Sequence, residues 1–368
     1  MGLLRFILAI SVVCAHGGGF FGYDIVGGRI AVEAFFVISG YLMQMVLAEK
    51  YNGRLVLFWS NRALRIYPTY YGALVFAILV SVALMPLGRG YFSRVEFLEA
   101  VADPLATLAI LVSTAAIVGQ EAFLFLRWTG SSLLYWPFDA HASAYTLMIL
   151  PPAWSISLEI MFYAAVPFLA HRSTLGLISL LAISLGGRLV LSVLGWNFDP
   201  WTHRFFPLEL AFFLIGMLSY RWRSGSTSFT RKLGDMKSFG LLMLATFAAH
   251  PAVIALTFLD LPAGIYISVY IAILILTLPV CVRISSSSRL DRKLGELSFP
   301  IYLTHWSVIE ALNVWLGGDG IVIGTARTLL AIAFSFVVSL LLVKMIETPI
   351  ERFRAGRSPP SKPQQPIL

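Results

Sequence analysis

The sequence predicts an all-α protein, a polytopic transmembrane bundle of about ten helices. Hydrophobic residues make up 58% of its 368 residues and charged residues only 12%, and the mean hydropathy is +0.82. Soluble domains carry about a quarter charged residues, and apolar runs long enough to cross a hydrocarbon core of about 30 Å recur along this chain. We therefore expect one membrane domain over residues 1–350. A disordered, basic and proline-rich cytoplasmic tail is expected over 351–368.

Apolar runs between charged residues define the expected spans. Residues 1–16 are similar to a secretory signal, but no small-residue cleavage site follows, so we interpret them as an uncleaved first helix. Residues 104–150 mix charged and aromatic side chains after an apolar start, which indicates a re-entrant segment or a pair of helices. The expected spans are 3–20, 27–48, 66–86, 153–170, 174–195, 205–221, 238–258, 262–282, 297–316 and 321–345.

Basic residues gather in four places, at Lys50–Arg65, Arg221–Lys237, Arg283–Lys293 and after Arg352. Lys and Arg are enriched in cytoplasmic loops, so these clusters and both termini are expected in the cytoplasm. This orientation holds along the whole chain only if 104–150 crosses the membrane an even number of times. The net charge of +8 is then explained by topology, and no nucleic-acid partner is expected.

Ionisable side chains at membrane depth are candidates for function, because each costs at least about 2.5–3.5 kcal/mol to insert. His16 lies about 18 Å from the cytoplasmic face and Glu33 about 22 Å, from the helix rise and the core thickness. At matching depths on neighbouring helices, the carboxylate could orient the imidazole and raise its basicity. A purely structural role in helix packing is the alternative for each.

Three arginines are expected near the cytoplasmic boundary. Arg62 and Arg65 lie three residues apart, so they project from one face of a helix. Paired guanidinium groups suit a phosphate, which they bind through bidentate hydrogen bonds. Arg5 precedes His16 by eleven residues on the first helix. Setting the topology is the alternative role for all three.

Other polar residues also fall within expected spans. Glu159 and His305 are candidate site residues, with structural hydrogen bonding as the alternative for both. Arg188 and Glu209 have no chemically suggestive neighbours, and the simplest interpretation is that they pair. The two cysteines are far apart in the sequence, so we expect no disulfide and no metal site.

Five motifs in order carry a resemblance to a known family. They are a basic-x10-His spacing from Arg5 to His16, AVEAFFVISGYL around Glu33, RALR at 62–65, WSISLE at 154–159 and FPIYLTHW at 299–306. The chain resembles the acyltransferase-3 family of integral membrane acyltransferases. That family O-acetylates lipopolysaccharide O-antigen, exopolysaccharide and lipochitooligosaccharide signals.

The resemblance implies an acyl-CoA-dependent enzyme of a bacterial cytoplasmic membrane. It implies that His16 is catalytic and that Arg5, Arg62 and Arg65 bind the donor. Acetyl-CoA or another acyl-CoA would be a substrate, with no permanently bound cofactor. The acceptor would be a carbohydrate or lipid-linked glycan. Glu33 stands where the family often has aspartate, which keeps the carboxylate and lengthens its reach.

The expected reaction transfers an acyl group from the thioester to a sugar hydroxyl. His16, supported by Glu33, would deprotonate the hydroxyl, and the arginines would hold the donor's phosphates. An acyl-histidine intermediate is a second route. A proton-coupled transporter or flippase of a lipid-linked or carbohydrate substrate, and a non-catalytic scaffold, are the alternatives to an enzyme. No GxSxG motif or His/Cys cluster indicates serine or metal hydrolysis.

Overall fold

The computed structural model describes residues 1–51, 53–139, 143–223, 228, 231–232, 234–259 and 264–357. It confirms the all-α membrane fold, because each expected span coincides with a helix. These helices are α1 (Gly2–Gly17), α2 (Gly28–Val46), α3 (Leu55–Leu84), α6 (Ala153–Ala170), α7 (Thr174–Val193), α9 (Phe206–Arg221), α11 (Asp235–Phe258), α12 (Gly264–Ser287), α13 (Arg289–Leu312) and α14 (Ile321–Leu342).

Seven helices in the described residues are long and apolar enough to cross a membrane. The helices at the other three expected spans are too short or too charged to meet this criterion. Helices α1 and α9 have only 16 residues each. Helix α13 has 24 residues, but it begins with the charged run RLDRKLGE. The chain is thus a multi-pass membrane protein.

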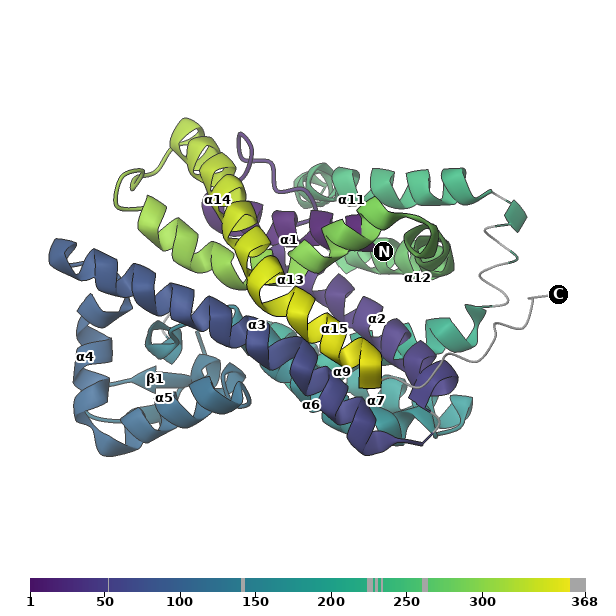
Figure 1. Ribbon diagram of the computed structural model, residues 1–368, viewed down its shortest axis with the longest axis horizontal. Helices are drawn as coiled ribbons and strands as arrows, with labels where there is room; N and C mark the ends of the chain where they lie inside the picture. Colours follow the sequence, from purple (N-terminus) through teal and green to yellow (C-terminus); the bar gives the residue numbers. More distant parts are fainter. Residues whose placement is uncertain are drawn as a thin grey trace.

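Helices α1 and α13 run side by side in the same direction near the centre of the bundle (Figure 1). At their first turns, the Asp291 carboxylate accepts hydrogen bonds from the backbone N–H groups of Gly2 (2.7 Å) and Leu3 (2.8 Å). Such a contact satisfies N–H groups that have no partner inside α1. Further along, the ring centroids of His16 and His305 are 5.2 Å apart. The capped start thereby fixes the two histidines at one level.

Helices α2 and α9 approach each other through glycines. A Cβ atom at Gly40 would lie 2.0 Å from the Phe213 carbonyl oxygen, and one at Gly216 would lie 2.0 Å from the Val37 carbonyl oxygen. Small residues of this kind let membrane helices pack backbone against backbone. The close contact brings the first half of α2 against the start of α9, where Glu33 and Glu209 lie close together.

Residues 85–139 and 143–150 form a lobe at the end of α3 that includes α4 (Val95–Ala102), α5 (Pro104–Ala116), β1 (Leu126–Trp128) and β2 (Leu133–Tyr135) (Figure 1). Helix α5 runs back along α3, since the Tyr67 and Tyr70 hydroxyls donate to the carbonyls of Ala116 and Thr114 at 2.8 Å each. The two strands pair as an antiparallel hairpin. The described part of residues 104–150 thus contains one short apolar helix, α5, and a hairpin, where the sequence indicated a re-entrant segment or paired helices.

Helices α3 and α6 run in opposite directions. The Trp59 indole N–H donates to the Tyr163 carbonyl (2.9 Å). Two turns later, Tyr67 contacts the end of α5, just before Gly119, whose N–H donates to Ser157 (3.1 Å). The segment between α3 and α6 therefore returns to the side it left. An even number of crossings by residues 104–150 stays a prediction from the distribution of basic residues.

The expected disordered tail is helical at its start. Helix α15 (Thr348–Arg357) lies against α3, with an ion pair of 2.6 Å between Arg65 and Glu351. Residues 358–368 of the expected tail lie outside the described residues. Both cysteines, Cys14 and Cys281, are buried free thiols.

Candidate active site

A cavity between α1, α2, α3, α6 and α13 brings together four residues that the sequence singled out. Arg5, Arg62, Arg65 and Glu159 all line it, although they come from three different helices. We call it the arginine cavity and define it by these four residues together with Tyr163 and Tyr302.

The three arginines of the cavity differ in their partners. Within the described residues, Arg5 makes no hydrogen bond or ion pair with another side chain. Arg62 contacts the Met43 sulfur at 3.8 Å, and its buried Nε has no hydrogen-bond partner in the described chain. Arg65 is paired with Glu351 on α15. Two guanidinium groups thus face the cavity without a carboxylate bonded to them, an arrangement that favours an anionic ligand.

Glu159 belongs to the wall of the cavity. One of its carboxylate oxygens accepts hydrogen bonds from the Ser39 hydroxyl (2.6 Å) and the Tyr163 hydroxyl (2.5 Å). The Ser39 bond links α2 to α6, and the Tyr163 bond lies within α6. Of the two interpretations made from the sequence, the structural one accounts for these contacts.

The far end of the cavity lies near the histidines. The Tyr302 hydroxyl is hydrogen-bonded to the Ser155 hydroxyl at 2.7 Å, and both residues line the cavity. The Tyr302 ring centroid is 5.9 Å from that of His305, which in turn contacts His16. A continuous series of side chains therefore leads from the arginines to the two imidazoles.

Both imidazoles have one nitrogen held by a backbone carbonyl. His16 Nδ1 lies 2.9 Å from the Val12 oxygen, and His305 Nδ1 lies 2.6 Å from the Tyr302 oxygen. A carbonyl can only accept, so in the neutral rings Nδ1 carries the proton and Nε2 keeps the lone pair. His305 is fully buried, whereas His16 is exposed. His16 Nε2 can therefore act as a base toward an incoming molecule.

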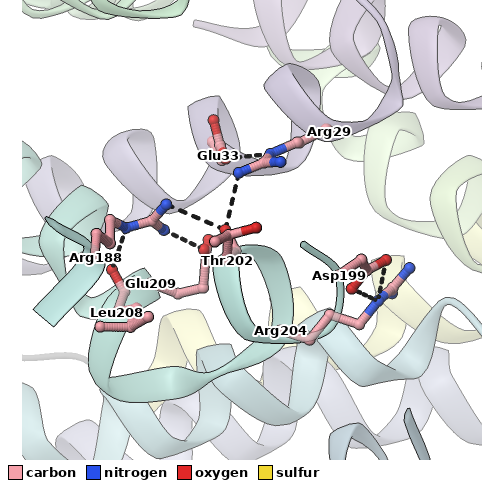
Figure 2. A network of polar contacts seen from close by, with 8 residues as sticks. All are labelled: Arg29, Glu33, Arg188, Asp199, Thr202, Arg204, Leu208 and Glu209. Carbon is pink, nitrogen blue, oxygen red and sulfur yellow. Dashed lines mark hydrogen bonds and ion pairs between the residues drawn. The ribbon is translucent and has the colours of Figure 1, made fainter. Parts of the chain in front are cut away.

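Glu33 does not lie where the sequence analysis expected it. Its carboxylate accepts a hydrogen bond from Arg29 Nε (3.0 Å), and no hydrogen bond or ion pair in the described residues joins it to His16 (Figure 2). Matched depth placed the two residues at similar levels but said nothing about rotation around the helix axis. Glu33 lies near Glu209 of α9. The Val12 carbonyl, and not Glu33, bonds to the His16 imidazole and orients it.

The Glu33 carboxylate instead lies within a second polar group, formed with His203 and Glu209. Arg188 bonds to Glu209, so the simple pairing expected for these two residues is present (Figure 2). His203 was not singled out from the sequence, because it lies in α8 (Trp201–Arg204), between two expected spans. Burial and the neighbouring Arg204 guanidinium hold the pKa of His203 well below its usual range, so its imidazole is neutral.

Arg204 was also missed from the sequence. Its guanidinium lies 4.3 Å from the centroid of the Trp154 ring and pairs with Asp199 (2.8 Å) (Figure 2). Trp154 opens the WSISLE motif, and its ring centroid is 5.0 Å from that of His203. This motif therefore contributes to two places, with Trp154 near α8 and Glu159 in the arginine cavity.

Comparison with known proteins agrees with the geometry. A family model described as an acyltransferase domain matches residues 1–344. The chain belongs to the acyltransferase-3 family. It is thus a membrane-bound acyltransferase, as the five sequence motifs indicated.

Two of three curated relatives match the acyltransferase over nearly its whole length. It is 25% identical over 354 residues to the exopolysaccharide production protein ExoZ of Rhizobium meliloti (strain 1021), which covers 92% of this chain and 93% of ExoZ. It is also 25% identical over 365 residues to a protein of Komagataeibacter xylinus named "Putative membrane-bound transacylase BcsY", which covers 92% of this chain and 80% of BcsY. Protein 2 in the picA locus of Rhizobium radiobacter is 28% identical over 175 residues, 47% of this chain and 82% of its own. No solved structure matches the chain.

Proposed function

We propose that this acyltransferase moves an acyl group, in the first instance acetyl, from cytoplasmic acyl-CoA to a hydroxyl of a cell-surface or lipid-linked carbohydrate. The observation that carries the proposal is the arginine cavity itself. At one end of the cavity, Arg5 and Arg62 have no carboxylate bonded to them within the described residues. The other end reaches Tyr302, beside the histidines. A long anionic thioester fits this layout, with its phosphates at the arginines and its acyl group near His16.

The length of the site supports coenzyme A as the carrier. Arg5 and His16 are eleven residues apart on one helix. At about 1.5 Å per residue this is a separation of roughly 16 Å along the axis. The pantetheine arm of coenzyme A is an extended chain that can bridge such a distance between its phosphates and its sulfur.

The reaction follows from the tautomer of His16. The lone pair on Nε2 takes the proton of the acceptor hydroxyl as its oxygen attacks the thioester carbonyl carbon. The carbon–sulfur bond then breaks, the sulfur leaves with the electron pair, and the imidazolium returns the proton to the thiolate. The carbonyl of Val12 stabilises the positive ring, since it accepts the Nδ1–H bond throughout.

The acceptor class rests on the relatives, of which ExoZ is named for exopolysaccharide production. The exposed position of His16 supports an acceptor that approaches from the end of α1 opposite to Arg5. With the basic loops and both termini in the cytoplasm, donor and acceptor would reach the site from opposite sides of a bacterial cytoplasmic membrane.

Replacement of His16 tests the proposal. General-base catalysis typically contributes about 10²–10⁴-fold, so His16→Gln should lower acyl transfer per folded molecule by that factor while coenzyme A binding persists. The measurement is release of the free coenzyme A thiol by purified protein in lipid nanodiscs with an added glycan acceptor. His171→Gln is the matched control, since His171 is an exposed residue at the end of α6. Turnover near that of the wild type in His16→Gln would refute the proposed role.

A further inference from the structure

Three buried side chains from three helices meet outside the arginine cavity. Glu33 of α2, His203 of α8 and Glu209 of α9 each offer one ligand atom, and these atoms all lie within 4.8 Å of one another. We call them the Glu–His cluster. The three residues are 1%, 8% and 0% exposed. A cluster so thoroughly removed from water has to satisfy its polar atoms within the protein.

The cluster leaves three polar atoms without a partner. Glu33 Oε2, Glu209 Oε2 and His203 Nδ1 are buried and make no hydrogen bond within the described residues. Buried polar atoms are almost always bonded, because leaving one unpaired costs its free energy of desolvation. Two carboxylate oxygens and one imidazole nitrogen are also the donor atoms that bind a metal ion.

Arginines already hold the other oxygen of each carboxylate. Arg29 donates to Glu33 Oε1 (3.0 Å) and Arg188 donates to Glu209 Oε1 (Figure 2). Arg29 and Arg188 also donate to the Thr202 carbonyl, at 2.9 Å and 3.1 Å, which fixes the residue next to His203. Hydrogen bonds to the outer oxygen of a ligating carboxylate are typical of metal sites, because they orient the inner oxygen.

The charges around the Glu–His cluster come from two carboxylates and the two arginines bonded to them. The Arg29 side chain is 43% exposed, so solvent screens its charge, whereas Glu33 beside it is buried. The charge of Arg188, 18% exposed, faces Glu209. The two carboxylates lie close together in a region of low dielectric, and the inner oxygen of each has no hydrogen-bond partner in the described residues. A cation between these oxygens would relieve the repulsion between them.

We propose that Glu33, His203 and Glu209 bind a divalent metal ion of the zinc class. The centre of a triangle with sides of 4.8 Å lies about 2.8 Å from each corner, and zinc needs about 2.0–2.2 Å to nitrogen and oxygen, so small side-chain shifts close the site. Imidazole favours zinc over magnesium or calcium, which prefer oxygen ligands alone. The two isolated cysteines predicted no metal site, and the three ligands proposed here meet only in the folded chain.

The metal would join α2 to α8 and α9 and so hold α8 in place. Helix α8 carries Arg204, whose guanidinium lies over Trp154. The site therefore has a structural role and is separate from the proposed acyl transfer at His16. Its presence can be tested whether or not the protein transfers acyl groups to carbohydrate.

Metal content is the direct measurement. Protein purified without chelators should contain about one zinc per chain by plasma mass spectrometry, and His203→Ala and Glu209→Gln should each lose it. Asp199→Asn is the matched control, because Asp199 is also an arginine-paired carboxylate next to α8 but does not belong to the cluster. A chelator should lower the melting temperature of the wild type and of Asp199→Asn, and zinc should restore it.

A second measurement uses the wild-type protein alone, so it does not depend on whether the variants fold. Zinc-edge X-ray absorption of the wild-type protein should show nitrogen and oxygen neighbours at about 2.0–2.2 Å and no sulfur. The proposal is overturned if the wild-type chain holds no zinc and its melting temperature responds to neither zinc nor chelator. The cluster would then bind only a water molecule or share a proton between its carboxylates.

Discussion

The molecule contains two groups of arginines, and they differ in what surrounds them. Arg5 and Arg62 face the arginine cavity and have no carboxylate bonded to them in the described residues. Arg29 and Arg188 each bond to a carboxylate that is almost fully buried. Both groups are cations placed inside a membrane bundle at a high cost in free energy.

The difference separates two uses of a buried charge. An arginine bonded to a buried carboxylate holds helices together, and its removal leaves the carboxylate uncompensated. An arginine without such a partner is available to an external anion, and its removal affects the ligand first. Replacement by alanine should therefore have different effects in the two groups. It should lower the stability of the protein at Arg29 or Arg188, and the affinity for the ligand at Arg5 or Arg62.

The largest expected effect is on stability at Arg188. Arg188→Ala would leave Glu209 buried without its ion-pair partner, and breaking such a pair typically costs about 3–5 kcal/mol. Unfolding in detergent, followed by circular dichroism, should show this loss, and Arg62→Ala should unfold close to the wild type. Equal losses in the two variants would remove the distinction between the groups.

The next effect is on donor affinity at Arg62 and Arg5. A hydrogen bond to a charged group contributes about 1.5–3 kcal/mol, so each alanine variant should raise the Kd for coenzyme A by roughly 10- to 150-fold. Arg62→Lys should recover only part of the affinity, since an ammonium cannot make the bidentate contact. Calorimetric titration with coenzyme A measures these Kd values. Wild-type affinity in both alanine variants would mean that the two arginines only set the topology.

A smaller effect is expected at Arg65, which occupies an intermediate position because it lines the cavity and also pairs with Glu351. The carboxylate competes with a bound phosphate for the same guanidinium. Arg65→Ala should therefore weaken coenzyme A binding less than Arg62→Ala does. The same titration ranks the two variants, and the reverse order would show that the ion pair opens when the donor binds.

The smallest effect is expected from the partner of that arginine. Exposed ion pairs contribute about 0–1 kcal/mol, and the Glu351 side chain is 46% exposed, so Glu351→Gln should change stability by no more than that. Freeing Arg65 should also tighten coenzyme A binding slightly. A large loss of stability would mean that α15 is a structural part of the bundle.

The sequence predicted the positions along the chain better than the directions of side chains. Apolar runs located the helices because the length of a span is set by the membrane. Depth likewise identified Arg62 and His16, whose surroundings support a ligand site. Depth could not show that Glu33 turns toward Glu209, since rotation around α2 depends on which helix packs there. His203 lies between spans, where hydropathy carries no signal.

Both native thiols are shielded from solution, and this has a practical consequence. Cys14 and Cys281 have no exposed surface, and thiol reagents require an accessible thiolate. The wild-type chain should therefore not react with maleimides. A cysteine introduced at position 54, 231 or 289 would then be the residue that is labelled. The sidedness of the basic loops can then be mapped without first removing a native residue. Labelling of position 231 from outside intact cells would reverse the orientation proposed here.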